Sequence, residues 1–182
     1  MKHPQHPQEL EKLMEWAAGS ESILEIGSKF GDTLREFAKI PTVKRIVSVD
    51  LPGTWPWGVV HSEQRLRACV DELEKTHDAH LFLGNSKDPE VIEAVRRLAP
   101  YDFIFIDGDH AYDGVKWDWT NYRGMGEKIA FHDIKPPPEG TRQELEVWKL
   151  WREIKDWAKI SGDVKTEEFF GEQTLMGIGL VG

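Results

Sequence analysis

The sequence predicts an α/β fold in which helices cover both faces of a doubly wound, mostly parallel sheet of seven strands. Short apolar segments alternate with segments of helical periodicity, which is typical of parallel βαβ units. The segment Phe103–Ile106 is apolar at every position, as expected of a strand that is buried on both faces. The last two predicted strands follow each other with no helix between them, so the last strand should run antiparallel.

The predicted elements fill the chain in order. Residues 1–19 are expected to hold an irregular leader and an amphipathic helix, Gln8–Ala18, whose apolar face carries Leu10, Leu13, Met14 and Ala17. The predicted strands are Ser22–Gly27, Val43–Val49, Ala79–Leu83, Phe103–Ile106, Lys128–Phe131, Val164–Phe169 and Thr174–Val181. The helices expected between them are Thr33–Ala38, His61–His77, Asp88–Leu98, Asp113–Tyr122 and Thr141–Ile160. At this length the whole chain, 1–182, is expected to be one domain.

Acidic residues, proline and glycine set the expected boundaries of these elements. Asp88 is a predicted N-cap with Pro89 at the first helical position, and Asp113 is the predicted cap of the next helix. The turn Gly171–Gln173 is too short for a parallel crossover, which is why the final strand pair should be antiparallel.

The bulk composition narrows the expected partners and compartment. The net charge of -9 argues against broad nucleic-acid binding, since a phosphate footprint needs clustered Lys and Arg. The single cysteine, Cys69, excludes an intrachain disulfide and lies in a helical pattern, where a buried apolar role is expected. No apolar segment is long enough for a membrane span, and the N-terminus lacks a signal-peptide core, so a cytoplasmic protein is expected. The oligomeric state is left open, with a homodimer among the alternatives.

Polar residues follow each of the first five predicted strands. They are Gly27-Ser28, Asp50, Asn85-Ser86, Asp107 and His132-Asp133. The alternative is that these polar residues do no more than close turns and cap helices, but chance would not place them so regularly at the carboxyl ends of strands. Because these ends line one crevice of a doubly wound sheet, we expect a ligand site there.

The segment Glu25–Gly31 is a glycine loop between the first strand and the next helix. Gly27 permits a tight turn, and Gly31 lets the start of the helix approach a ligand. The loop is not the Gly-x-Gly-x-x-Gly dinucleotide fingerprint, because Lys29 stands where the second glycine would be. Asp50, after the second strand, is placed to accept hydrogen bonds from ribose hydroxyls.

These residues together resemble the class I S-adenosylmethionine-dependent methyltransferases. The resemblance rests on the glycine loop, Asp50, Gly84-Asn85-Ser86, the strand that ends at Asp107 and the final antiparallel pair. The segments Asp107–His110 and Phe131–Asp133 are further similar to a small, family-24-like branch near catechol O-methyltransferase and cephalosporin-hydroxylase-like proteins. The resemblance covers nearly the whole chain and implies a Rossmann-like sheet.

The resemblance implies S-adenosylmethionine as the cofactor. The cofactor-binding residues that it implies are Glu25, Gly27, Ser28, Gly31, Asp50, Leu51, Asn85, Ser86 and Asp107. The first four would cradle the amino-acid part, Asp50 would hold the ribose and Leu51 would pack against the adenine. Asn85 and Ser86 would lie at the adenine edge. The family often has Asp at the first of these positions, so Asn85 lacks the negative charge of that acceptor.

The resemblance also implies a divalent-metal site formed by Asp107, His132 and Asp133. The fourth and fifth strands should be neighbours roughly 5 Å apart, so these side chains can converge on one ion. Two carboxylates favour Mg²⁺, and a histidine shifts the preference towards Mn²⁺, Fe²⁺ or Zn²⁺. The alternative is that His132 and Asp133 fix the loop or contact the substrate directly.

His110 follows Asp107 at the position where catechol-type enzymes place a general base. Histidine titrates close to neutral pH, so it could take the proton of an attacking hydroxyl. A metal would instead lower the pKa of the hydroxyl itself. His110 and Asp107 are therefore the predicted catalytic residues, and Asp109 is assigned a structural role in orienting His110.

The prediction is an S-adenosylmethionine-dependent methyltransferase that O-methylates a small hydroxylated acceptor, either a saccharide or another metabolite. A nicotinamide-dependent oxidoreductase is the second hypothesis, weakened by the missing fingerprint and the reversed last strand. A third is a non-catalytic cofactor-binding or scaffold protein, with Trp-rich faces as a partner surface. The loops Leu51–Gly58 and Pro136–Gly140 should border the acceptor pocket, with Trp55 and Trp57 packed under the first or, as the alternative, stacked on a sugar or aromatic ring.

Overall fold

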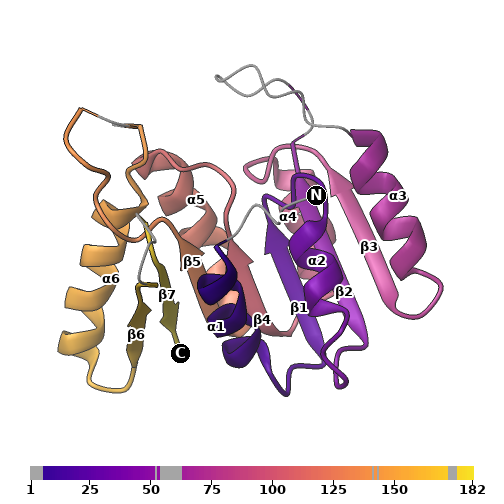
Figure 1. Cartoon of the computed structure of the whole chain (residues 1–182), viewed down its shortest axis with the longest axis horizontal. Coiled ribbons are helices and arrows are strands. Elements are labelled where there is room, and N and C mark those ends of the chain that lie inside the picture. The colour runs from indigo at the N-terminus through magenta and orange to yellow at the C-terminus, as the bar shows by residue number, and fades with distance from the viewer. Residues whose placement is uncertain (1–5, 52, 54–62, 141, 143, 172–175) are drawn as a thin grey trace.

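The computed structural model describes residues 6–51, 53, 63–140, 142, 144–171 and 176–182. Seven strands form one sheet in the order β3-β2-β1-β4-β5-β7-β6 (Figure 1). The strands are β1 Ser22–Ile26, β2 Arg45–Asp50, β3 Asp78–Leu83, β4 Tyr101–Ile106, β5 Gly126–His132, β6 Thr166–Phe169 and β7 Ile178–Val181. The neighbouring strands are parallel except where β7 pairs with β5 and with β6. The mostly parallel sheet is therefore confirmed, and its reversed strand is β7, inserted between β5 and β6.

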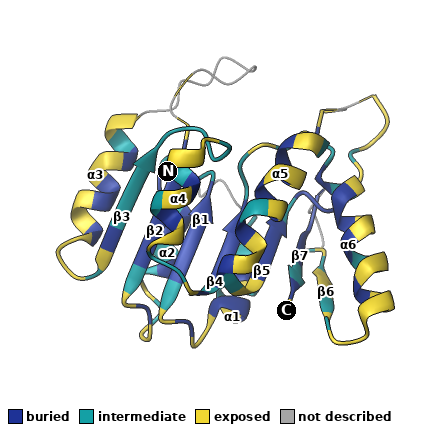
Figure 2. Ribbon diagram, turned by 180° about the vertical axis from the view of Figure 1, so that it is seen from behind, coloured by how far each residue is buried: buried dark blue, intermediate teal, exposed yellow. Residues whose placement is uncertain are grey.

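Helices cover both faces of this sheet. In the described part of the chain they are α1 Pro7–Ala17, α2 Asp32–Phe37, α3 Glu63–Leu73, α4 Pro89–Arg96, α5 Tyr112–Tyr122 and α6 Val147–Ser161. The first three pack with Phe103 and Phe105 of β4, and the last three pack with Ile104 and Ile106. Figure 2 shows the outcome, buried strands between helices whose outer sides are exposed. Among the described residues, no helix is long and apolar enough to cross a membrane.

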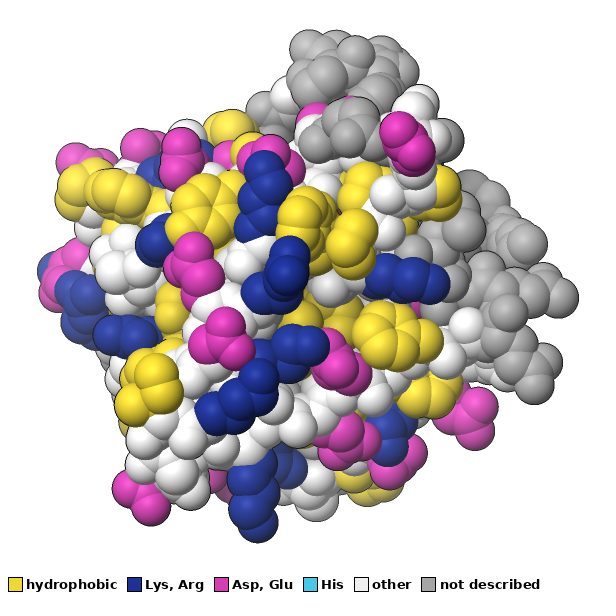
Figure 3. Space-filling view, turned by 90° about the vertical axis from the view of Figure 1, so that its left-hand side faces the viewer, with side chains coloured by type: hydrophobic (Ala, Val, Ile, Leu, Met, Phe, Trp, Pro, Cys, Tyr) yellow, Lys and Arg dark blue, Asp and Glu magenta, His cyan; other side chains and the backbone are white. Residues whose placement is uncertain are grey.

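Aromatic rings fill the space between α5, α6 and the sheet. The ring of Phe131 lies 5.7 Å from Trp119 and 5.9 Å from Trp151, measured between centroids. Trp157 packs on Trp119 at 6.2 Å and stays 43% exposed. Figure 3 shows the side of the molecule that carries α6, where basic side chains lie among hydrophobic ones. These tryptophans therefore serve mainly packing.

The predicted start of the last helix is wrong. α6 begins at Val147 rather than at Thr141. The backbone N–H of Glu146 donates to the carbonyl oxygen of His110 at 2.8 Å. This bond holds the segment before α6 against the loop between β4 and α5.

The predicted cap of α5 is also wrong. The helix begins at Tyr112, so Asp113 lies in its first turn. Asp109 Oδ1 instead accepts from the backbone N–H of Ala111 at 3.0 Å, which closes a turn just before the helix.

Two further expectations concern strand and loop residues. β2 begins at Arg45 rather than at Val43, because the strand opposite it, β1, begins at Ser22 and pairs with Arg45. Trp55, Trp57 and residues 172–173 of the predicted final turn lie outside the described residues.

The buried face of α1 differs from the predicted one. It carries Glu9, Leu13, Trp16 and Ala17, whereas Leu10 and Met14 are only half-buried. The face is therefore rotated, and it brings a carboxylate into the interior.

Backbone hydrogen bonds align the strand ends at one edge of the sheet. The N–H of Gly27 donates to Val49 at 2.8 Å, and the N–H of Asp107 donates to Ile26 at 2.9 Å. The N–H of Gly84 likewise donates to Asp50 at 2.9 Å. The glycine loop, Asp50 and Asp107 consequently leave the sheet side by side.

Gly27 is the residue for which this alignment requires a glycine. Its φ is +93°, and an added Cβ would lie 2.3 Å from the carbonyl oxygen of Asp107. A side chain there would therefore strain the backbone and push β1 away from β4.

Gly27→Ala should lower the free energy of unfolding by about 1–3 kcal/mol, because it combines a positive φ with a backbone clash. Gly124→Ala is the matched control, since nothing lies within 4 Å of an added Cβ there, and it should change stability by less than about 0.5 kcal/mol. Urea unfolding measures both variants. Equal losses would contradict the assigned role of Gly27.

Candidate active site

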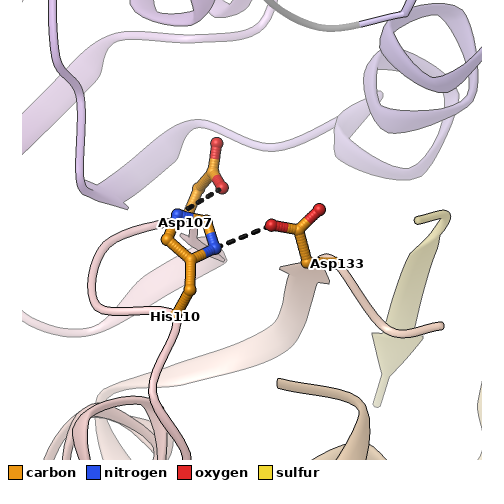
Figure 4. Close-up of side chains that lie close together, drawn as sticks. All are labelled: Asp107, His110 and Asp133. Atoms are coloured by element: carbon orange, nitrogen blue, oxygen red, sulfur yellow. Dashed lines mark ion pairs between the residues drawn. The ribbon is translucent and has the colours of Figure 1, made fainter. Parts of the chain in front are cut away.

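Three ionisable side chains meet at the carboxyl ends of β4 and β5. Figure 4 shows Asp107, His110 and Asp133, with the imidazole between the two carboxylates. His110 Nδ1 lies 2.7 Å from Asp133 Oδ2, and His110 Nε2 lies 3.9 Å from Asp107 Oδ1. The side chains of His110 and Asp107 are 14% and 17% exposed, so the group is reachable from solvent.

The local backbone explains how these side chains are held. Asp107 directly follows β4, and its N–H is bonded to β1. Asp133 directly follows β5 in the left-handed region, with φ of +62°, a conformation that Asp adopts more readily than most residues. The carbonyl of His110 is held by the segment before α6. Each group is thus fixed by a different neighbouring element.

Asp133 is shared between two histidines. Its Oδ2 faces His110 Nδ1 at 2.7 Å, and its Oδ1 faces His132 Nδ1 at 2.9 Å. Because a carboxylate only accepts, each facing nitrogen carries the proton and donates. His110 is therefore oriented with Nε2 on the side of Asp107. Asp109, predicted to orient His110, pairs instead with Lys87 at 2.7 Å, so Asp133 takes that role.

His132 lies between three carboxylates. Its Nδ1 is 3.5 Å from Asp107 Oδ1 as well as close to Asp133, and its Nε2 is 3.5 Å from Glu9 Oε2. Glu9 is 4% exposed and was not among the residues predicted for the site. Its helical spacing with Leu13 and Trp16 was the available signal, since these residues share one face of α1.

The charges in this network shift its pKa values in opposite directions. Burial lowers the pKa of His132, but Asp107 and Asp133 outweigh it and raise the pKa well above the ordinary value. Burial likewise lowers the pKa of His110, and its hydrogen bond to Asp133 with the charge of Asp107 raises it overall. Burial raises the pKa of Asp133, but the two imidazoles bring it below the ordinary value. The carboxylates thus favour the protonated form of both imidazoles, and the imidazoles favour the ionised form of Asp133.

The residues of the predicted metal site lie close together in the structure, with His110 beside them. Asp107, His132 and Asp133 are neighbours as expected, but the group whose donor atoms all lie within 4.8 Å of one another contains His110 in place of His132. Both oxygens of Asp133 lie close to imidazole nitrogens, so a cation bound here would replace at least one of these contacts. The metal site at Asp107, His132 and Asp133 therefore stays a prediction.

In the glycine loop between β1 and α2, every second residue from Gly27 to Gly31 has a positive φ. The angles are +93° at Gly27, +54° at Lys29 and +78° at Gly31. The N–H of Lys29 donates to Asp50 Oδ2 at 2.7 Å, so Asp50 also holds this loop. An added Cβ at Gly31 would lie 2.5 Å from Cys69 Sγ, so Gly31 serves the contact between α2 and α3. Cys69 is buried, as predicted.

Glu25 is a buried carboxyl at the root of this loop. Burial raises its pKa well above the ordinary value, against a hydrogen bond with Ser28, and the charges of Asp107 and Asp50 add to the rise. Its Oε2 has no hydrogen-bond partner among the described residues. Ser28 in turn accepts from Ser48 Oγ at 2.8 Å. An open acceptor beside a glycine loop fits the ammonium end of an amino acid.

The remaining predicted residues follow β2 and β3. Asn85 Oδ1 accepts from the N–H of Lys87 at 3.0 Å, and the carbonyl of Ser86 accepts from Tyr122 at 2.9 Å. Leu51 is 59% exposed, which leaves its side chain open to a ligand. All these residues lie at the same edge of the sheet as His110, and their roles stay predictions.

Comparison with known families identifies the class. The sequence model of a methyltransferase domain family matches residues 24–134, which is more than half of the chain. The chain belongs to this methyltransferase family. The match includes every site residue predicted above, from Glu25 to Asp133, while Glu9 lies outside it. A search of curated proteins finds no match.

Solved methyltransferases share the fold across nearly the whole chain. A Staphylococcus aureus protein named as a candidate caffeoyl-CoA O-methyltransferase is 16% identical, with a TM-score of 0.69 over 98% of this chain and 84% of its own. A Bacillus cereus O-methyltransferase in complex with SAH is also 16% identical, with a TM-score of 0.66 over 100% and 83%. TomG, an O-methyltransferase from Streptomyces achromogenes in complex with SAM, is 14% identical, with a TM-score of 0.64 over 98% and 80%. The predicted methyltransferase class is thus confirmed by the family match, and the solved structures confirm the predicted fold.

Proposed function

We propose that the enzyme transfers a methyl group from S-adenosylmethionine to a hydroxyl of a small acceptor, with His110 as the general base. The observation that carries this proposal is the 2.7 Å contact of His110 Nδ1 with Asp133, which leaves the other ring nitrogen on the side of Asp107, 3.9 Å from its Oδ1. An imidazole held in this way by a carboxylate is the usual arrangement of a general base.

The residues at the carboxyl ends of β1, β2 and β3 are suited to bind S-adenosylmethionine. Glu25 and the glycine loop would hold the amino-acid end, because Glu25 Oε2 has no protein partner among the described residues. The buried Asp50 would accept from the ribose hydroxyls, and the exposed Leu51 would cover the adenine. Asn85 and Ser86 would border the adenine edge. When bound, the cofactor supplies an electrophilic methyl group.

His110 would handle the proton of the acceptor. In its neutral form, Nε2 accepts the proton that the acceptor hydroxyl loses as its oxygen takes the methyl group. Asp133 then stabilises the imidazolium, because its carboxylate already accepts from Nδ1. The nearby Asp107 adds a second negative charge at 3.9 Å. The protein thereby supplies position and electrostatics rather than new covalent chemistry.

A small, hydroxylated acceptor suits this enzyme best, either a saccharide or another metabolite. The net charge of -9 disfavours a nucleic acid. The loop Pro136–Gly140 follows the end of β5 and would border the acceptor, whereas most of the loop Leu51–Gly58 lies outside the described residues.

Asp50→Ala should weaken the binding of SAH by at least about tenfold, because the ribose loses a charged acceptor and Lys29 loses its partner. Asp50→Asn keeps one acceptor oxygen and should retain part of the affinity. Isothermal calorimetry measures both variants against Asp71→Ala, an exposed aspartate on α3. Wild-type protein that binds no SAH would refute the cofactor assignment.

His110→Ala should slow methyl transfer by about 10²–10⁴-fold and remove the ascending limb of the pH–rate profile. The raised pKa of His110 means that its base form, and hence activity, appears above the ordinary histidine value near 6.5. SAH release is measured with a panel of catechols and monosaccharides. His80→Ala, which removes another histidine paired with an aspartate, is the control. A limb that persists in His110→Ala would exclude His110 as the base.

Dialysis against EDTA should leave methyl transfer unchanged, because both oxygens of Asp133 already accept from imidazoles. Metal content is measured alongside by mass spectrometry. Loss of activity that Mg²⁺ or Mn²⁺ restores would instead support the metal site predicted at Asp107, His132 and Asp133.

A further inference from the structure

The segment His110–Tyr112 connects the proposed base to the start of helix α5. Ala111 is the residue before the helix, and its side chain has no polar atom with which to cap it. The first N–H groups of a helix have no partner inside the helix, so they need an acceptor from another source. The start of α5 therefore depends on an acceptor that lies elsewhere in the fold.

Glu146, the residue before α6, bonds to this segment twice. Its backbone N–H donates to the carbonyl oxygen of His110 at 2.8 Å. Its side-chain Oε2 accepts from the backbone N–H of Tyr112 at 3.2 Å, across 34 positions of the chain. The two bonds hold the peptide groups on both sides of Ala111. The carboxylate also suits the start of a helix, where negative charge is favourable.

Glu146 is itself fixed by its neighbours. Leu145 and Val147 are each 4% exposed, so the chain is anchored in the interior on both sides of Glu146. Its Oε1 pairs with Lys149 in the first turn of α6, which leaves Oε2 for Tyr112. A side chain held in this way can in turn fix the segment that it contacts.

We infer that Glu146 is a positioning residue for His110 and acts through the backbone of residues 110–112. The inference rests on the proposed role of His110 as the base. Glu146 holds the backbone of His110, and Asp133 lies 2.7 Å from its Nδ1, so the residue is held at both ends. Without the Glu146 carboxylate, the N–H of Tyr112 loses its acceptor and the turn that carries the imidazole can shift. A displacement of about 1 Å near the reacting atoms can cost about 10²-fold in rate.

The alternative is that Glu146 serves only to join α5 to α6. Glu153 is the matched control, because this carboxylate of α6 accepts from the hydroxyl of the same Tyr112 at 2.6 Å rather than from its backbone. Glu146→Ala removes the side-chain acceptor and keeps the backbone N–H. Glu146→Gln keeps an oxygen that can accept from Tyr112 but removes the charge.

The test combines amide hydrogen exchange with a long-range ¹H–¹⁵N spectrum of labelled histidine rings. Both are recorded on the whole protein without cofactor, after dialysis against EDTA. In Glu146→Ala, the Tyr112 amide should exchange at least about tenfold faster, because its hydrogen bond is lost, and the ring resonances of His110 should shift. Glu146→Gln should restore both at least in part. Glu153→Ala should leave both close to wild type.

An unshifted His110 ring in a folded Glu146→Ala protein would overturn the inference, as would an equal shift in Glu153→Ala. Thermal unfolding reports whether each variant is folded. If Glu146→Ala does not fold, Glu146→Asp, whose carboxylate is one methylene group shorter, carries the same comparison.

Methyl transfer and cofactor binding are measured on the same samples. With an acceptor that the wild type methylates, Glu146→Ala should lower kcat by about tenfold or more. The Kd for SAH should stay within about twofold of wild type, because the bonds of Glu146 go to residues outside the proposed cofactor site. An unchanged kcat would count against the positioning role. Wild-type protein that binds no SAH would refute the proposed function and leave the exchange and ring measurements interpretable.

Discussion

The carboxylate of Asp133 accepts from two imidazoles at once, and the candidate site at the carboxyl end of β5 is built around this shared acceptor. One oxygen lies 2.7 Å from His110 and the other 2.9 Å from His132. A carboxylate this deeply buried is tolerated only where other groups replace its hydration. The two imidazoles do so, and their rings become fixed relative to β5. The direction of His110, on which the proposed chemistry depends, follows from this arrangement.

The places of Asp107 and Asp133 could be predicted because each directly follows an apolar strand. The fourth and fifth strands are adjacent in the sheet as well as in the chain, so the two aspartates had to be neighbours. The direction of His110 could not be predicted in the same way. It depends on the path of a loop that is held by the N–H of Glu146, a residue far along the chain. The sequence therefore predicted that Asp107 and Asp133 would be neighbours, but Asp109 was expected to orient His110, whereas Asp133 lies beside the imidazole and Asp109 pairs with Lys87.

The burial of Glu9 could not be predicted from the periodicity of apolar residues in α1. Carboxylates in a surface helix are normally exposed, so the pattern around Leu10 and Met14 favoured a different buried face. The observed face depends on His132 and Gly177, which only the folded sheet brings to α1. The family match begins at residue 24 and does not reach this helix. The methyltransferase core was thus predictable from its motifs, whereas its connection to α1 was not.

The bond between Glu9 and Gly177 joins residues 168 positions apart in the chain. Contacts of such long range form late, since a large loop must close before they are gained. During synthesis, α1 and the strands that hold the cofactor residues emerge well before Gly177 and β7. A nascent chain can therefore complete the strands that carry the proposed cofactor residues before the bond between α1 and Gly177 can form.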